Sequence, residues 1–148
     1  MLEIINLTKV YGDVRAVDDI SFTAQPGVIT GFLGPNGAGK TTTMRIILGL
    51  DKPTAGKVLT NGKQYTKSSA PLREIGALLD AKAADKGRSA RNHLRAVGAT
   101  VGVGKKRVDE VLDMVGLTEV AHKSAGSFSL GMGQRLGIAS ALLADPSV

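Results

Sequence analysis

Apolar positions along the first 80 residues of the chain predict mainly β-structure with one helix. Residues 20–24 alternate between apolar and polar side chains, as in a half-buried strand. Residues 28–33 form a short apolar run with β-branched side chains, as in a buried strand. We expect an apolar helix over residues 42–50, and the pair Asn61-Gly62 indicates a hairpin turn. The expected strands are residues 2–7, 20–24, 28–33, 57–60 and 75–79.

The later part of the chain has the apolar spacing of helices instead. Apolar side chains recur every three or four positions over residues 105–115 and 136–143. Gly116 is placed to end the first of these helices, and Asp145-Pro146 ends the second. Ser89 can cap a further helix that precedes both.

The whole sequence has 148 residues, of which 43% are hydrophobic and 22% are charged. This balance is typical of a folded domain rather than a disordered chain. We divide it into an α/β part over residues 1–80 and a helical part over residues 81–148. The sequence contains no cysteine, which excludes disulfides and thiolate metal sites.

The sequence contains no targeting or membrane-spanning pattern. Glu3 stands where a signal peptide needs basic residues, and no apolar stretch approaches the roughly 20 residues that span a bilayer. A net charge of +6 suits a surface that attracts polyanions, but we favour an ordinary charged surface, because the basic residues are spread along the chain. Aromatic residues make up only 3% of the chain, so we expect no nucleic acid partner that stacks on them.

A glycine-rich loop follows residues 28–33. It fits the pattern G-x-x-x-x-G-K-[ST] at every fixed position, with a strand expected before it and a helix after it. Its glycines let successive N–H groups point at phosphate oxygens, and the helix adds its positive dipole end. Lys40 would bind the β- and γ-phosphates, and the Thr41 hydroxyl is a hard oxygen ligand for Mg²⁺. The predicted phosphate-binding residues are Gly34, Pro35, Asn36, Gly37, Ala38, Gly39, Lys40, Thr41 and Thr42.

A second motif, at the start of the last expected helix, narrows the choice among phosphate-binding proteins. Residues 128–135 read FSLGMGQR and resemble L-S-G-G-Q, the signature of the ATP-binding cassette (ABC) family. Aligned on Gln134-Arg135, Ser129 takes the signature serine and Gly131 the second glycine. Such variants look like those of bacterial drug- or antibiotic-export cassettes. The departures from the signature are Phe128, Leu130 and Met132.

Ser129 has two interpretations. A serine and a glycine at a helix N-terminus can offer a hydroxyl, N–H groups and a helix dipole to a γ-phosphate. In the family, that phosphate belongs to ATP held by the opposite subunit. The alternative is a simple helix cap, which serine also favours.

Three further positions gain a role from this resemblance. The family places an aromatic residue before the loop, where it stacks on adenine, and Tyr11 matches it. Val17 matches a small apolar residue that lines the same pocket. At the end of the strand expected here at residues 75–79, the family also has a glutamine. That glutamine reaches Mg²⁺ and the attacking water. Asp80 takes that position, either as a Mg²⁺ ligand that cannot donate a hydrogen bond at neutral pH or as a plain loop residue.

The resemblance covers essentially the whole chain. It implies an α/β fold: a P-loop NTPase core of the ABC type with an N-terminal antiparallel β part, a helical subdomain and an incomplete sheet. It also implies ATP hydrolysis that powers transport, with ATP and Mg²⁺ as cofactors. The implied partners are a transmembrane permease subunit and a second nucleotide-binding subunit, identical or different. We expect a cytoplasmic protein held at the inner face of the cell membrane by the permease.

In the family, an aspartate of the Walker B motif and a catalytic glutamate would come after the position of Val148. We therefore expect the 148 residues to be truncated before that motif, to bind ATP at most, and to hold no catalytic residue. The alternatives are a soluble ABC ATPase that acts on ribosomes or DNA, an inactive fragment, and, least favoured, a P-loop kinase. His93 and His122 lack metal-ligand spacing, so we expect neither to act in chemistry.

Overall fold

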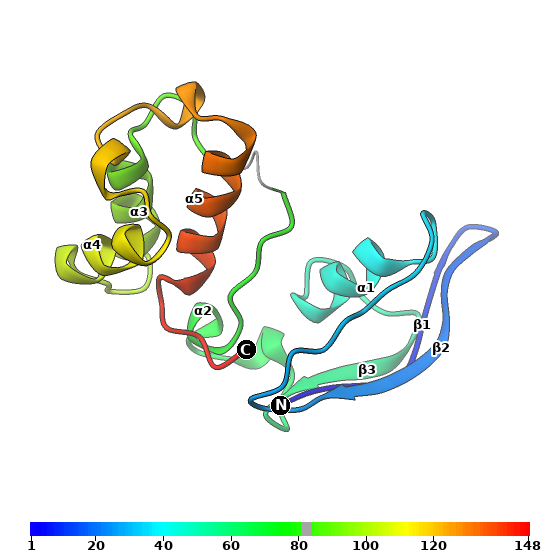
Figure 1. The fold of residues 1–148 in the computed structure, drawn as a ribbon. Coiled ribbons are helices and arrows are strands. Elements are labelled where there is room, and N and C mark those ends of the chain that lie inside the picture. The colour runs from blue at the N-terminus through cyan, green and yellow to red at the C-terminus, as the bar shows by residue number, and fades with distance from the viewer. Residues whose placement is uncertain (81–83) are drawn as a thin grey trace. The chain divides into compact units, whose positions relative to one another are not determined.

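The structure is a computed structural model that describes residues 1–80 and 84–148. The described chain divides into two compact units (Figure 1). The first unit comprises Met1–Glu74 together with Val148, and the second comprises Ile75–Ser147. The division expected from the sequence, between residues 80 and 81, borders residues 81–83, which lie outside the described residues.

An antiparallel sheet forms the first unit (Figure 1). Its strands are β1 (Leu2–Tyr11), β2 (Val14–Ala24) and β3 (Ala55–Thr60), in the order β2-β1-β3. The β1–β2 hairpin pairs from Leu2 with Ala24 to Tyr11 with Val14, so Tyr11 lies beside its turn. Strands were predicted at residues 2–7, 20–24 and 57–60, and each is confirmed within a longer strand.

The turn after β3 has the conformation that its sequence predicts. Asn61 and Gly62 have φ angles of 49° and 79°, as the tight turn of a hairpin requires. The Thr60 and Lys63 backbones exchange two hydrogen bonds, of 2.7 and 3.0 Å. The predicted turn is therefore confirmed.

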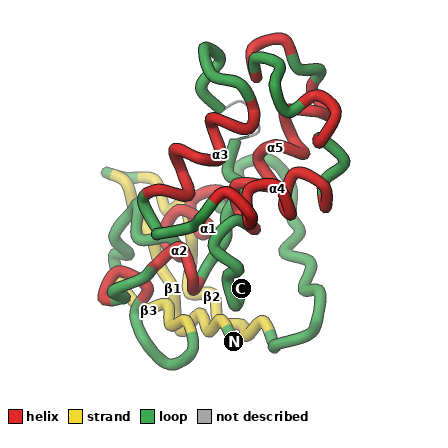
Figure 2. Tube along the Cα trace, turned by 90° about the vertical axis from the view of Figure 1, so that its left-hand side faces the viewer, coloured by secondary structure: helices red, strands yellow, loops and turns green. Residues whose placement is uncertain are grey.

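Helix α1 (Lys40–Ile47) lies over the sheet of the first unit, as Figures 1 and 2 show. Thr43, Ile46 and Ile47 are its buried residues, so its apolar side chains pack inward. Gly49, with φ +68°, donates to the carbonyl of Ile46 at 3.0 Å and ends the helix. The 3-10 turn η1 (Tyr65–Lys67) and the short helix α2 (Pro71–Glu74) follow β3.

Two predicted strands are wrong. Residues 28–33 are not in a strand, and Val28, Ile29 and Leu33 are exposed. A buried strand depends on neighbouring strands for its hydrogen bonds and apolar contacts, and no strand among the described residues pairs with this segment. Residues 75–79 pack against a helix instead: a Cβ atom on Gly76 would lie 2.2 Å from the carbonyl oxygen of Ala141.

The second unit is helical. It contains α3 (Ala90–Ala99), α4 (Lys105–Met114) and α5 (Leu130–Leu142), with the 3-10 turns η2 (Thr118–Val120) and η3 (Ala125–Ser127). Within residues 1–80 and 84–148, no helix has the length and apolar character that crossing a bilayer requires. The buried core of the unit consists of Ala90, Leu94, Val108, Val111, Leu112, Leu117, Ala121, Leu136, Ala139 and Leu143.

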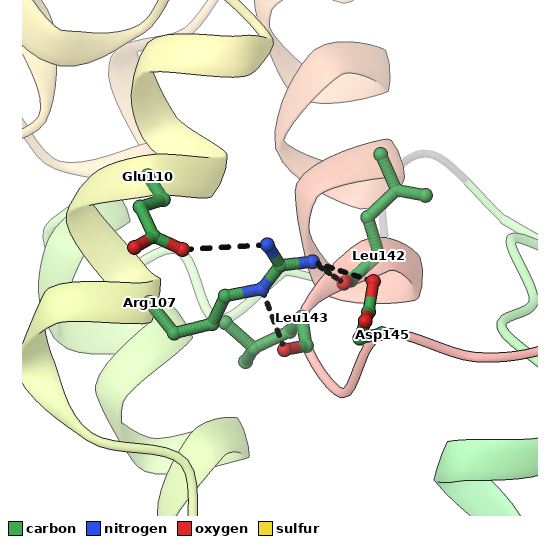
Figure 3. Close-up of polar contacts among 5 residues, drawn as sticks. All are labelled: Arg107, Glu110, Leu142, Leu143 and Asp145. Atoms are coloured by element: carbon green, nitrogen blue, oxygen red, sulfur yellow. Dashed lines mark hydrogen bonds and ion pairs between the residues drawn. The ribbon is translucent and has the colours of Figure 1, made fainter.

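Arg107 of α4 binds the end of α5 (Figure 3). Its guanidinium donates to the carbonyls of Leu142 at 3.0 Å and Leu143 at 3.4 Å, and it lies 3.3 Å from the Asp145 carboxylate. Glu110, on the same helix as Arg107, accepts from the remaining nitrogen at 3.4 Å. Carbonyls at a helix C-terminus lack partners within the helix, so a cation that donates to them caps α5.

Candidate functional site

The phosphate-binding motif forms a tight loop between residues 28–33 and α1. Gly37 and Gly39 have φ angles of +84° and +81°, which L side chains rarely adopt. A Cβ atom on Gly39 would also lie 2.2 Å from the carbonyl oxygen of Ala16 in β2. The Ala38 N–H donates to the Pro35 carbonyl at 3.2 Å and closes a turn within the loop. The loop therefore passes close to β2, and glycine is required at position 39.

The start of α1 offers unused backbone donors. Its N-cap is Gly39, which has no side chain with which to cap the helix. The hydrogen bond from the Thr43 N–H to the Gly39 carbonyl, 2.8 Å long, begins the helical series. The N–H groups of Lys40, Thr41 and Thr42 come before it and point out of the helix end. Together with the positive end of the helix dipole, they suit an anion.

The Lys40 side chain folds back over the loop. Its ammonium donates to the carbonyls of Gly34 and Pro35, both at 2.7 Å. Beside it is a pocket of about 430 Å³ between the loop and β2. The Lys40 ammonium and the N–H groups of the first turn of α1 are donors that fit a polyphosphate, and the pocket beside them gives it room. The residues that line the pocket are Arg15, Ala16, Val17, Asp18, Ile20, Phe32, Leu33, Gly37, Ala38 and Lys40.

Val17 and Tyr11, the two positions assigned to the adenine, both belong to this unit. Val17 is buried beneath the loop, and its Cγ2 lies 3.0 Å from where a Cβ of Gly39 would be. Tyr11 is 45% exposed. The Lys9 ammonium lies 4.5 Å from the centroid of the Tyr11 ring, within the range of a cation–π contact.

The Tyr11 hydroxyl is bound by residues that the sequence analysis did not single out. It donates to Oδ2 of Asp51 at 3.0 Å, and the same oxygen accepts from Nε of Arg45 at 2.7 Å. Arg45 and, more weakly, Tyr11 lower the pKa of the Asp51 carboxyl by donating to it. Desolvation, aided by Asp51, raises the pKa of Tyr11. In the sequence, Arg45 follows Thr41 and Thr42 by one helical turn, but nothing there indicates its contact with Asp51 or Tyr11.

The signature residues belong to the second unit. Ser129 is the N-cap of α5, and its Oγ accepts from the Met132 N–H at 3.3 Å. Gly131 lies in the first turn of α5, and a Cβ atom there would meet nothing within 4 Å. The helix start is therefore open to an incoming group. A pocket of about 300 Å³ lies beside it, lined by Ala84, Lys86, Ala125, Gly126, Phe128, Ser129, Leu130, Gly133 and Leu136.

Asp80 and the histidines also belong to the second unit. Asp80 is exposed and directly precedes residues 81–83. The described residues hold no group of three or more His, Asp or Glu side chains that could bind a metal by themselves. His93 is half-buried, with Nε2 3.4 Å from the Ser140 hydroxyl, and His122 is exposed. Tyr11, Val17 and the phosphate loop thus share one unit, whereas Asp80, Ser129 and Gly131 share the other.

Comparison with known proteins gives sequence relatives along the whole chain. A sequence model of the ABC transporter family matches residues 17–148. The ABC transporter ATP-binding protein YhcH of Bacillus subtilis is 45% identical over 150 residues, which cover 100% of this chain and 49% of YhcH. The bacitracin transport ATP-binding protein BcrA of Bacillus licheniformis is 43% identical, also over 100% of this chain and 49% of the relative. The chain therefore spans about half the length of these relatives.

A further relative and two solved structures agree with these matches. The lantibiotic transport ATP-binding protein SrtF of Streptococcus pyogenes is 34% identical over 100% of this chain and 64% of SrtF. The dimeric structure of MJ0796, a bacterial ABC transporter cassette, has a TM-score of 0.87 at 26% identity and covers 99% of this chain and 71% of its own. A post-hydrolysis dimer of MJ0796 bound to ADP and Pi has a TM-score of 0.85 at 26% identity, with the same coverage.

Proposed function

Because the chain belongs to the ABC transporter family, whose sequence model matches residues 17–148, we propose that it forms the ATP-binding part of a transporter ATPase. The alternative of a soluble cassette that acts on ribosomes or DNA is not favoured. The relatives are named for bacitracin and lantibiotic transport.

The geometry of the phosphate loop is the observation that carries this proposal. The loop, the uncapped first turn of α1 and the Lys40 ammonium lie next to one another and beside β2, which supports phosphate binding there. The phosphates of ATP would bind there, with Lys40 at the β- and γ-phosphates. The adenine would stack on Tyr11 next to Val17. The ADP- and Pi-bound relative supports a nucleotide as the ligand.

We also propose that Thr41 binds Mg²⁺. Its exposed hydroxyl offers the hard oxygen atom that Mg²⁺ prefers, and the carboxylate of Asp80, in the other unit, has the same chemistry. When bound with the nucleotide, Mg²⁺ supplies positive charge that offsets the charge of the phosphates. Thr41 would hold the ion from the start of α1, next to the N–H groups that bind the phosphates.

Ser129 and Gly131 are proposed to act on ATP held by a second nucleotide-binding subunit. The open first turn of α5 can offer its N–H groups and the Ser129 hydroxyl to a γ-phosphate. The dimeric relatives support such a pairing. Closure of the pair would drive a separate transmembrane permease, which would keep this protein at the inner face of the membrane.

The transported molecule is proposed to be a drug or antibiotic. The support is the S-x-G-M form of the signature at residues 129–132 and the relatives named for bacitracin and lantibiotic transport. Deleting the coding region of the protein from its host and measuring growth against bacitracin and a lantibiotic would test this assignment. Unchanged sensitivity to both would contradict it.

Titration of the purified protein with MgATP tests the central proposal. We expect saturable binding by the wild type and binding roughly 10- to 100-fold weaker in Lys40→Ala, because charge-assisted hydrogen bonds to phosphate are lost. Lys63→Ala is the matched control, since Lys63 lies in the turn after β3 and carries the same charge. Equal affinity of wild type and Lys40→Ala would refute phosphate binding at this loop.

A further inference from the structure

Tyr11 is fixed to the protein more firmly than its exposure suggests. Its hydroxyl and the Arg45 guanidinium meet on one carboxylate oxygen of Asp51, while a second nitrogen of Arg45 donates to the other oxygen at 3.3 Å. A bidentate Arg–carboxylate pair holds a defined geometry. Asp51 therefore presents Oδ2 to Tyr11 in one orientation, and Arg45 is the residue that sets it.

The loop that carries Asp51 is bound at both of its sides. Toward α1, the N–H groups of Leu50 and Asp51 donate to the Arg45 carbonyl, at 2.9 and 3.4 Å. Toward β1, the Lys9 ammonium donates to the Lys52 carbonyl at 2.8 Å. The Thr54 hydroxyl accepts from the Val10 N–H at 3.0 Å, and the Thr54 N–H donates to the Thr8 carbonyl at 2.9 Å. The loop thus connects α1 with the end of β1.

The Tyr11 ring has one face covered. The Lys9 ammonium that binds the loop also lies 4.5 Å from the ring centroid. A base would therefore stack on the opposite face. Rotation about the second side-chain bond of tyrosine leaves the hydroxyl oxygen in place, so the hydrogen bond to Asp51 fixes the direction in which the ring extends. The Lys9 ammonium above the ring restrains which way its faces point.

Arg45 also belongs to the helix that begins at the phosphate loop. Thr41 and Thr42, at the start of α1, precede Arg45 by one turn. The path from the phosphate loop to Tyr11 therefore runs along α1 to Arg45, across Asp51, and onto the tyrosine hydroxyl. Every link in this path is a hydrogen bond or a rigid helical turn.

We propose that Asp51 and Arg45 are positioning residues that hold the Tyr11 ring at a fixed distance and angle from the phosphate loop, so that base and phosphates bind together. This inference rests on the proposed nucleotide-binding function. It assigns no contact between Asp51 and the nucleotide. Asp51 and Arg45 act on the base through Tyr11 alone. Replacing Asp51 should therefore weaken the binding of ligands that carry a base and leave the affinity for ligands without a base unchanged.

The test compares MgATP with magnesium tripolyphosphate, which has the phosphates and no base. Dissociation constants are measured by calorimetry for wild type, Tyr11→Phe, Asp51→Ala and the double variant. We expect each single variant to bind MgATP roughly three- to tenfold more weakly, the effect of losing one hydrogen bond, and to bind tripolyphosphate as wild type does. The double variant should be no weaker than either single one, because both remove the same contact.

Two further variants separate positioning from stability. Asp51→Asn retains an oxygen for the Tyr11 hydroxyl and should keep more ATP affinity than Asp51→Ala. Asp109→Ala breaks the Arg91–Asp109 ion pair between two helices of the second unit and should leave both affinities unchanged. Thermal unfolding of each variant confirms that it is folded before titration.

The outcomes distinguish the inference from the function on which it rests. If Asp51→Ala weakens the binding of tripolyphosphate as much as the binding of MgATP, Asp51 supports α1 and not the Tyr11 ring. The inference then fails, while ATP binding by the protein stands. The same holds if Tyr11→Phe binds MgATP as wild type while Tyr11→Ala does not, since the ring then needs no anchor. Wild type that binds neither ligand overturns the proposed function and the inference together.

Discussion

Gly76 is in direct contact with the backbone of Ala141: a Cβ atom on Gly76 would lie 2.2 Å from the Ala141 carbonyl oxygen and 2.8 Å from Cγ of Pro146. The segment that follows α2 therefore lies against the end of α5, at a distance that only glycine permits. The same segment contacts α5 a second time, where a Cβ atom on Gly137 would lie 2.4 Å from Cδ1 of Leu78.

Gly76→Ala should destabilise the protein by on the order of 1–3 kcal/mol, because the new methyl group meets backbone that cannot move aside. Gly137→Ala is the matched control. Its obstacle is the end of the flexible, exposed Leu78 side chain, and alanine favours the helix by about 1 kcal/mol. Urea unfolding measures both. Equal destabilisation by the two variants would show that the backbone contact at Gly76 is not the tighter one.

Arg107→Ala should lower the free energy of unfolding by on the order of 1–3 kcal/mol, because it leaves the carbonyls of Leu142 and Leu143 without their charged donor. Arg107→Lys keeps the charge without the planar fork and should restore only part of this loss. Hydrogen exchange over residues 142–145 should rise in Arg107→Ala. Arg91→Ala removes an arginine that pairs with Asp109 and should cost less, since no helix end depends on it.

Ser129 and Ser89 form a pair that separates capping from action on a nucleotide. Each caps a helix through an Oγ that accepts a backbone N–H at 3.3 Å. Replacing either by alanine should cost about 1 kcal/mol of stability. Only Ser129→Ala should also reduce ATP-dependent dimer formation, measured by sedimentation in the presence of MgATP. A similar reduction in Ser89→Ala would assign the effect to lost stability.

His93 should make stability depend on pH. Burial, with a smaller contribution from Arg88, lowers the pKa of His93 from its usual value of 6.5, against an opposing effect of Asp85. The unfolded chain therefore takes up a proton at higher pH than the folded chain does. The free energy of unfolding should fall as the pH drops below 6.5 and level off below the folded pKa. Unfolding of His93→Gln between pH 5 and 8 should lack this component.

Features that depend on a few consecutive residues could be predicted from the sequence. The turn at Asn61-Gly62 and the cap at Ser89 follow from local backbone chemistry, and both are confirmed. The fold class, a P-loop NTPase core of the ABC type with an antiparallel β part and a helical part, is confirmed as well. It could be predicted because the two motifs that define it are contiguous stretches of sequence.

Features that depend on distant partners could not be predicted. Residues 28–33 have the composition of a buried strand, but composition does not supply the neighbours that a strand needs. The meeting of Tyr11, Arg45 and Asp51 joins a strand end, a helix and a loop, and no periodicity brings them together in the sequence. Arg107 likewise reaches the end of a helix far along the chain. The roles of Tyr11, Asp80 and Ser129 toward ATP and Mg²⁺ stay predictions.

Lys40 holds its own loop by the same ammonium group that is assigned to the phosphates. Two of its three N–H donors are already engaged by the carbonyls of Gly34 and Pro35. An arriving phosphate would therefore compete with two backbone oxygens for one cation, and the measured affinity would report a difference between two sets of hydrogen bonds. The side chain thus connects the start of α1 to the first two residues of the loop, and phosphate binding would exchange that connection for one through the ligand.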